Sequence, residues 1–367
     1  MSYNYSTSIF TLALQQMAGN TFLGDEVHNS VLNVTFECIP PYHSVQYILR
    51  AVVYSIICFL GLTGNSFSLW TLLTNKNTTI FRNPFMISLA VMDLQFAFCL
   101  PFKVIYHAKG SNWIFGEVFC KVFHSLYISN IFGCPLILTC ISIERYIALV
   151  PPNRTLQLHR QAFRIALSCF IWVVVLTACV SLTCSGKLTN QLNKDRTACG
   201  ESFSQVEWIH RIGIMSIVGS CFGFFVPFLI LMICYTVIAR KLSNLLGENP
   251  ATLNIKKKSM RTILIVITVL TVCFLPFHTI NIIRTALILQ KLNSSYNRFC
   301  TAYSIMEAVT SFNSCLNPIV YYHQAEGFNW MSHCCHSQDE TDEAANREQR
   351  ESHKHATRTD LPVTNAP

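Results

Sequence analysis

One carboxylate, Asp93, stands inside a long apolar stretch that reads Leu89-Ala90-Val91-Met92-Asp93. A charged acid in hydrocarbon is costly unless it is paired, bound to a metal ion or protonated, so such a residue marks a functional site by default. The alternative is a neutral, hydrogen-bonded Asp93 that only holds helices together. We favour the functional interpretation.

No arrangement for bond chemistry accompanies this acid. His278 is the only histidine deep within an apolar stretch, and no Ser, Cys or metal ligand stands at a useful spacing from it. The 17 cysteines show no metal-ligand spacing. We therefore expect a protein that is not an enzyme, and we also expect no nucleic-acid partner.

A second group, Glu144-Arg145-Tyr146, lies near the end of the apolar run 117–150. This run is longer than the ~20 residues that a helix needs to cross a bilayer, which predicts a tilted central span. Charges at the end of a membrane helix reach the interface, where Arg145 can pair with Glu144. The pair serves either as a simple anchor or as a switch, and the motifs described below favour a switch.

The composition predicts the membrane helices that position these residues. The chain is 51% hydrophobic and only 13% charged, whereas soluble domains average ~25% charged residues. Its apolar residues form long blocks instead of a scattered pattern. We predict an all-α membrane protein, a bundle of seven transmembrane helices over 46–74, 83–108, 117–150, 163–184, 208–242, 258–290 and 298–323.

The positive charges set the orientation of the bundle. Residues 1–45 contain no Lys or Arg, whereas the connection before the sixth span carries Lys256, Lys257, Lys258 and Arg261. Basic connections stay in the cytoplasm, so we expect an extracellular N-terminus, a cytoplasmic C-terminus and a multi-pass protein of the plasma membrane. The outer segments then contain three glycosylation sequons, at Asn4, Asn33 and Asn293.

Cysteines sort by side of the membrane. Cys38, Cys120, Cys199 and Cys300 fall on the oxidising outer face, where four cysteines allow three pairings. On the inner face, just past the last span, Cys334 and Cys335 are candidates for palmitoylation, which would make the protein a lipoprotein.

The order of motifs, one in each span, resembles the rhodopsin-like G-protein-coupled receptors over about residues 46–330. Within that superfamily, Leu-Pro-Phe-Lys from Leu100 and Cys-Phe-Leu-Pro-Phe-His from Cys273 resemble the purinergic, protease-activated and lysophospholipid branch. The motifs are Asn65, Asp93, Trp113, Cys120, Glu144-Arg145-Tyr146, Trp172, Cys199, Pro227, Tyr235, Cys273-Phe-Leu-Pro276 and Asn317-Pro-Ile-Val-Tyr321.

The resemblance implies roles for particular residues. It pairs Cys120 with Cys199 and Cys38 with Cys300. It implies a structural sodium ion, and no other cofactor, because a hard cation takes carboxylate and amide oxygens. The implied sodium site comprises Asp93, Asn65, Asn130, Asn313 and Asn317, with Cys134 where a hydroxyl is usual.

It also implies a switch at the inner end, with Arg145 held by Glu144 in the inactive state. Pro276 marks a bend about which the sixth span opens, because proline removes a helical hydrogen bond. Tyr235 and Tyr321 would then approach Arg145. The full switch set is Glu144, Arg145, Tyr146, Tyr235, Phe274, Pro276 and Tyr321.

Cations beside aromatic residues predict the ligand class. An anionic ligand with a greasy or aromatic body, a lipid before a nucleotide, suits such a pocket. Glu307 argues against direct binding of an anionic ligand by these cations, since it can neutralise Lys103 or Arg284. The competing interpretation is that the cations only pair with Glu307 and with acids in the loops. The predicted ligand residues are Lys103, Tyr127, His278, Asn281, Arg284 and Glu307, with Lys187 and Lys291 in the loops.

The resulting organisation is an extracellular glycosylated segment over 1–45, a receptor domain over 46–323, a short juxtamembrane helix over 324–335 and a disordered cytoplasmic tail over 336–367. Expected partners are a heterotrimeric G protein, an extracellular small-molecule or lipid ligand, membrane lipids, arrestin and receptor kinases. Two alternatives stay open: a decoy receptor of the same fold that does not signal, and a transporter, for which we see no internal repeat.

Overall fold

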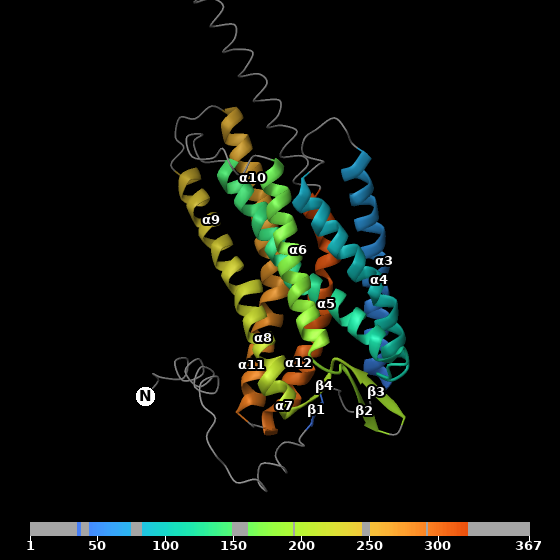
Figure 1. Cartoon of the computed structure of the whole chain (residues 1–367). Helices are drawn as coiled ribbons and strands as arrows, with labels where there is room; N and C mark the ends of the chain where they lie inside the picture. The colour runs from blue at the N-terminus through green and yellow to red at the C-terminus, as the bar shows by residue number, and fades with distance from the viewer. Residues whose placement is uncertain are drawn as a thin grey trace, which may run out of the picture.

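The computed structural model describes residues 35–37, 44–74, 83–148, 161–193, 195–243, 250–290 and 293–321. Asn4, Asn33, Cys38, Lys291, Cys334, Cys335, the juxtamembrane helix and the tail lie outside the described residues. Figure 1 shows the described part as a bundle of long helices with short strands gathered at one end.

Long apolar runs fold as helices because a helix satisfies its own backbone hydrogen bonds away from water. Four of them are single helices: α3 (Ser44–Thr74), α4 (Pro84–Ala108), α5 (Gly116–Ala148) and α6 (Gln161–Cys184). At its start, α4 has Asn83 as the N-cap, whose side chain accepts a hydrogen bond from the Phe85 N–H.

Two further spans are composite. One runs through α7 (Gln205–Glu207), η2 (Trp208–Ile212), α8 (Gly213–Ser220), η3 (Cys221–Phe225) and α9 (Val226–Ser243). The other runs through α10 (Pro250–Val269), η4 (Leu270–Phe274) and α11 (Leu275–Leu289). These six spans are the described helices that are long and apolar enough to cross a membrane.

The π-helical turns η3 and η4 directly precede Pro227 and Pro276, which lie near the starts of α9 and α11. Proline has no N–H for the carbonyl four residues earlier, and those carbonyls belong to Gly223, within η3, and Val272, within η4. A wider turn lets other groups take the released carbonyls. The regular α-helix therefore gives way just before Pro227, and it does so likewise just before Pro276, where the sequence predicts a bend.

The predicted span 298–323 corresponds to α12 (Asn293–Ser311) followed by helical residues 313–321. The helix is interrupted at Phe312, whose N–H bonds the Val309 carbonyl at 3.1 Å and whose carbonyl accepts from the Cys315 N–H at 3.0 Å. This tighter turn divides the segment. Helix α12 is long enough to be a span, but it is rich in Asn, Ser and Thr and is not among the six apolar spans.

Two strand pairs cap the bundle at the end that also holds α7 (Figure 1). Strand β2 (Thr189–Asn193) pairs antiparallel with β3 (Arg196–Cys199), and β1 (Thr35–Glu37) pairs antiparallel with β4 (Ser202–Ser204). A disulfide joins Cys120 of α5 to Cys199 of β3, with 5.8 Å between their Cα atoms, which confirms that predicted pairing. Cys300 is also disulfide-bonded.

Candidate functional site

A cavity of about 400 Å³ lies inside the bundle, next to the β3–β4 connection, whose residues Gly200 and Glu201 help to line it. It has a polar end and an apolar arm. Five of the predicted ligand residues lie at the polar end: Lys103, Tyr127, Asn281, Arg284 and Glu307.

Lys103 and Glu307 form an ion pair across the polar end. The Lys103 Nζ lies 2.7 Å from Glu307 Oε1, and both side chains are largely buried. The same ammonium lies 4.2 Å from the ring centre of Tyr127 and 4.8 Å from that of Tyr54. Aromatic faces attract a cation, so Lys103 is held by one carboxylate and two rings. Glu307 therefore does neutralise Lys103.

Arg284 of α11 lies between two aromatic side chains. Its guanidinium carbon is 3.7 Å from the ring centre of Tyr303 and 4.9 Å from that of Trp208. The neighbouring Asn281 donates hydrogen bonds to Ser216 at 2.6 Å and to Ser220 at 3.2 Å. These contacts fasten α11 to α12, η2 and α8 around the polar end.

Sequence reasoning misses a second acid in this cavity, Glu201. The Tyr106 hydroxyl donates a hydrogen bond to Glu201 Oε2 at 2.9 Å. Burial raises the pKa of the Glu201 carboxyl, Glu307 adds to the rise, and Lys103 and Arg50 oppose it. The carboxyl therefore takes up a proton more readily than an exposed glutamate does.

Gly200 explains how Glu201 reaches the cavity. Its φ is +73°, in the left-handed region that glycine adopts at little cost, and a Cβ at this position would lie 2.8 Å from the His124 ring. The chain thus turns sharply after Cys199, toward the interior. An acid two residues beyond the cysteine implied to pair with Cys120 is the sequence signal that would have pointed to Glu201.

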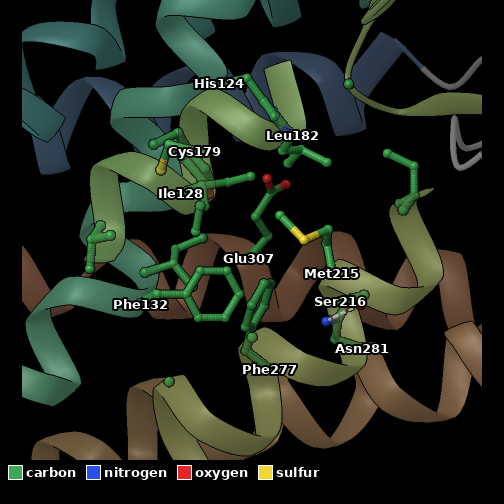
Figure 2. Close-up of a pocket in the computed structure, with 18 of the residues that line it drawn as sticks. His124, Ile128, Phe132, Cys179, Leu182, Met215, Ser216, Phe277, Asn281 and Glu307 are labelled. Atoms are coloured by element: carbon green, nitrogen blue, oxygen red, sulfur yellow. Dashed lines mark hydrogen bonds between the residues drawn. The ribbon is translucent and has the colours of Figure 1, made fainter. Parts of the chain in front are cut away.

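The apolar arm runs between α5, α6 and η3. Ile128 and Phe132 line it from α5, and Val174 from α6. Phe170 and Phe222 line its outer part and are 63% and 67% exposed on the surface of the bundle. In Figure 2, Ile128, Phe132 and Leu182 surround the cavity into which Glu307 projects.

Two glycines shape this arm. A Cβ on Gly219 or Gly223 would lie 2.7 Å or 2.8 Å from the ring of Phe132. Their lack of a side chain lets the Phe132 ring lie against the backbone of the neighbouring span.

His278 is a correction to the predicted ligand set, because it is not among the residues that line the cavity. Its ring is covered instead, stacked 4.6 Å from Phe224 and flanked by Phe132 at 5.6 Å and Phe277 at 5.2 Å between ring centres. Its Nδ1 lies 3.1 Å from the Ser220 hydroxyl. The predicted loop residue Lys187 is exposed and does not line the cavity either.

Around Asp93, the structure brings together most of the predicted sodium residues. Asn130 and Asn317 donate hydrogen bonds to the two carboxylate oxygens at 3.0 Å and 2.7 Å, and the Cys134 thiol lies 3.7 Å away. The Asn313 side-chain amide donates a hydrogen bond to the side-chain oxygen Oδ1 of Asn130 at 3.4 Å. Asn65 instead donates to the backbone carbonyls of Gly61 and Ser314, at 3.0 Å and 2.8 Å.

Several oxygens of this cluster have no hydrogen-bond partner among the described residues. They are buried, and a buried polar atom without a partner is rare unless a water or an ion meets it. These oxygens are suitable ligands for a hard cation such as sodium, which takes oxygen ligands. The atoms are Asn65 Oδ1, Asn313 Oδ1, Asn317 Oδ1 and Ser314 Oγ.

At the end of the bundle opposite the strand pairs, which we call the inner end, Glu144 has partners that the sequence does not predict. One carboxylate oxygen lies 2.6 Å from Arg164 Nη2 of α6, and the other accepts a hydrogen bond from Asn83 at 2.8 Å. The closest contact of Glu144 is thus with α6, and its charge also acts on the neighbouring Arg145. That Glu144 holds Arg145 in the inactive state stays a prediction. Arg145 is itself 3% exposed.

The remaining switch residues lie at different depths. Tyr321 places its hydroxyl 3.5 Å from Asp93, in the central cluster. Phe274 is fully buried, 6.3 Å from Phe224 between ring centres, and Pro276 follows it at the start of α11. Tyr146 and Tyr235 pack against the cluster of buried apolar side chains that includes Met86, Ile141 and Ile263.

Comparisons with known proteins agree with this architecture. Residues 64–321 match the family described as 7 transmembrane receptor (rhodopsin family). The chain is 31% identical to human lysophosphatidic acid receptor 4 over 318 residues, which cover 84% of this chain and 82% of the relative.

Two further relatives have different ligands in their names. A purinoceptor of Mus musculus is 32% identical over 280 residues (76% of this chain, 74% of the relative). Human cysteinyl leukotriene receptor 2 is 32% identical over 278 residues (76% and 78%). These relatives are receptors and not enzymes, as the sequence predicts. The chain therefore belongs to the rhodopsin family of seven-transmembrane receptors, and is a multi-pass cell-surface G-protein-coupled receptor of the branch that contains the lysophosphatidic acid, purinergic and cysteinyl leukotriene receptors.

Proposed function

We propose that this receptor binds an extracellular single-chain lipid with a negatively charged head group and, in response, activates a heterotrimeric G protein. The observation that supports this proposal is the lining of one cavity, which combines the buried cations Lys103 and Arg284 with apolar side chains of α5, α6 and η3. Lys103 and Arg284 suit a phosphate or carboxylate, and the arm suits a hydrocarbon chain.

The arm favours a lipid over a nucleotide. Phe170 and Phe222 bound it on the lipid-facing surface of the bundle, so a chain lying there stays out of water along its length. A nucleotide would bring several negative charges to a polar end that already contains Glu201 and Glu307. Like charges at short range oppose binding.

Coupling is proposed to run from this pocket to the inner end through the bends at η3 and η4. The ligand residues Asn281 and Arg284 belong to α11, directly beyond η4 and Pro276. A ligand that binds one arrangement of this span more tightly shifts the population toward it. The inner end of the span would then expose Arg145 to the G protein.

We also propose that a sodium ion occupies the Asp93 cluster in the inactive receptor. The support is the group of buried oxygens without hydrogen-bond partners on Asn65, Asn313, Ser314 and Asn317. Cys134 supplies a soft thiol there and is a poor ligand for a hard cation.

A guanine-nucleotide exchange assay tests the proposed function. Membranes containing the full chain and purified G protein are treated with single-chain anionic lipids or with nucleotides. We expect exchange with lipid and none with nucleotide. A lipid that binds without stimulating exchange on any G protein would identify a decoy receptor instead.

A further inference from the structure

Two carboxylates face the ligand cavity, and only one of them is neutralised by a cation in direct contact. Glu307 lies 2.7 Å from the Lys103 ammonium. Glu201 accepts a hydrogen bond from the neutral Tyr106 hydroxyl, and among the described residues it takes part in no ion pair. The cavity therefore presents a carboxylate whose nearest partner carries no charge.

Aromatic rings surround the part of the cavity where Glu201 lies. Tyr106, Trp113 and Phe123 all line it. The ring centres of Tyr106 and Trp113 are 6.1 Å apart, and those of Trp113 and Phe123 are 5.3 Å apart. Aromatic faces beside a carboxylate are the setting in which proteins bind quaternary ammonium groups.

Arg284 gives the same cavity a cation on another side, since it projects from α11 and lies over the Tyr303 ring at 3.7 Å. A guanidinium binds phosphate through several directed hydrogen bonds. The polar end thus offers Glu201 for a positive group and Arg284 for a negative one. A head group with only negative charges would satisfy Arg284 and meet repulsion from Glu201.

We propose that the receptor selects a single-chain lipid whose head group is zwitterionic, with an ammonium against Glu201 and the Tyr106–Trp113–Phe123 rings and a phosphate against Arg284. This inference rests on the proposed lipid function and narrows it, because it keeps the negatively charged phosphate of the head group and adds a positive group beside it. It makes Glu201 the residue that decides between a zwitterionic and a purely anionic head group.

Two lipid probes with one shared tail test this assignment: radiolabelled oleoyl lysophosphatidylcholine and oleoyl lysophosphatidic acid. Each is measured against the full chain in nanodiscs, with ATP as a third ligand. Wild type should bind the choline probe at least about tenfold more tightly than the phosphate monoester. Glu201→Gln should weaken the choline probe by about tenfold and strengthen binding of the monoester, because it removes the negative charge.

Glu207→Gln is the matched control. Glu207 caps α7 through Ser204, pairs with Arg211 at 3.4 Å and does not line the cavity, and glutamine also serves at that capping position. This variant should keep the wild-type preference. If Glu201→Gln folds poorly, the preference of the wild-type chain for the choline probe over the monoester still tests the assignment.

The possible results separate the two proposals. Equal binding of both lipids by wild type, or a preference that Glu201→Gln leaves unchanged, overturns the zwitterion assignment while the lipid function stands. Binding of ATP alone overturns the lipid function. Binding of none of the three probes overturns both.

Discussion

Two buried ion pairs sit at opposite ends of the bundle, and they differ in what surrounds them. Lys103–Glu307 joins α4 to α12 beside a cavity, at 2.7 Å. Arg164–Glu144 joins α5 to α6 at 2.6 Å, where Asn83 supplies a further hydrogen bond to the carboxylate. The outer pair can exchange partners with a ligand, whereas the inner pair has its carboxylate fully engaged by protein.

This difference assigns the two ends different tasks. A pair that lines a cavity lies within reach of a ligand bound there, so its charges are available for recognition. A pair enclosed by three helices holds those helices together, and its removal leaves an uncompensated charge in the interior. We therefore expect variants of the outer pair to change binding and variants of the inner end to change coupling and stability.

The largest expected effect is the loss of nucleotide exchange in Arg145→Ala, measured beside Lys103→Ala in the same assay. Arg145→Ala should abolish exchange at every ligand concentration while surface expression persists, because we propose that this cation contacts the G protein. Lys103→Ala should keep the maximal response and lower potency by about 10-fold, the loss of one charge-assisted contact. Retained exchange in a well-expressed Arg145→Ala receptor would remove the proposed division of tasks.

The next contrast compares the stability of Glu144→Ala and Glu307→Ala. Glu144→Ala should lower the free energy of unfolding by about 3–5 kcal/mol, because Arg164 is left buried without its carboxylate. Glu307→Ala should cost less, about 1–3 kcal/mol, because the Lys103 ammonium keeps its contacts with the Tyr54 and Tyr127 rings. Thermal unfolding of the purified variants in one detergent measures both. A larger loss for Glu307→Ala would reverse the comparison.

A smaller effect is expected at the Asp93 cluster, between the two pairs. Asp93→Asn removes the carboxylate that a sodium ion needs, while an amide keeps its size. Agonist affinity of the wild type should fall by a few-fold when sodium replaces potassium, since the ion stabilises the inactive arrangement. The affinity of Asp93→Asn should be the same in both salts. An equal sodium response in wild type and variant would remove the proposed ion.

The sequence predicts the bundle well because a membrane span needs a long apolar run, and such runs are visible without an alignment. The Cys120–Cys199 bridge is different, because four outer cysteines allow three pairings and the family resemblance selects among them. Charge partners across helices were predicted only in part, since the sequence offers Lys103 as a partner for Glu307 but does not point to Arg164 as a partner for Glu144. Arg145 is the obvious neighbour of Glu144 along the chain, yet Arg164 reaches it from another helix.

The site also contains residues whose roles depend on backbone geometry. Glu201 enters the cavity because Gly200 adopts a positive φ, and one loop acid among several carries no periodic signal. His278 is the opposite case, since its depth in the sixth span suggests a pocket residue. The rings of Phe132, Phe224 and Phe277, which come from three spans, cover it.

The smallest expected effect extends the comparison into the apolar arm. In Gly219→Ala the new methyl group would lie 2.7 Å from the Phe132 ring, so that ring must turn into the arm. Overpacking of this kind costs about 1 kcal/mol, or roughly fivefold in affinity, and should affect a long-chain lipid more than one with a short chain. Ile214→Ala is the control, because Ile214 is exposed on the same span and does not line the cavity. Competition binding with lipids that share a head group and differ in tail length measures the effect. Equal losses for both tail lengths would place the lipid chain outside this arm.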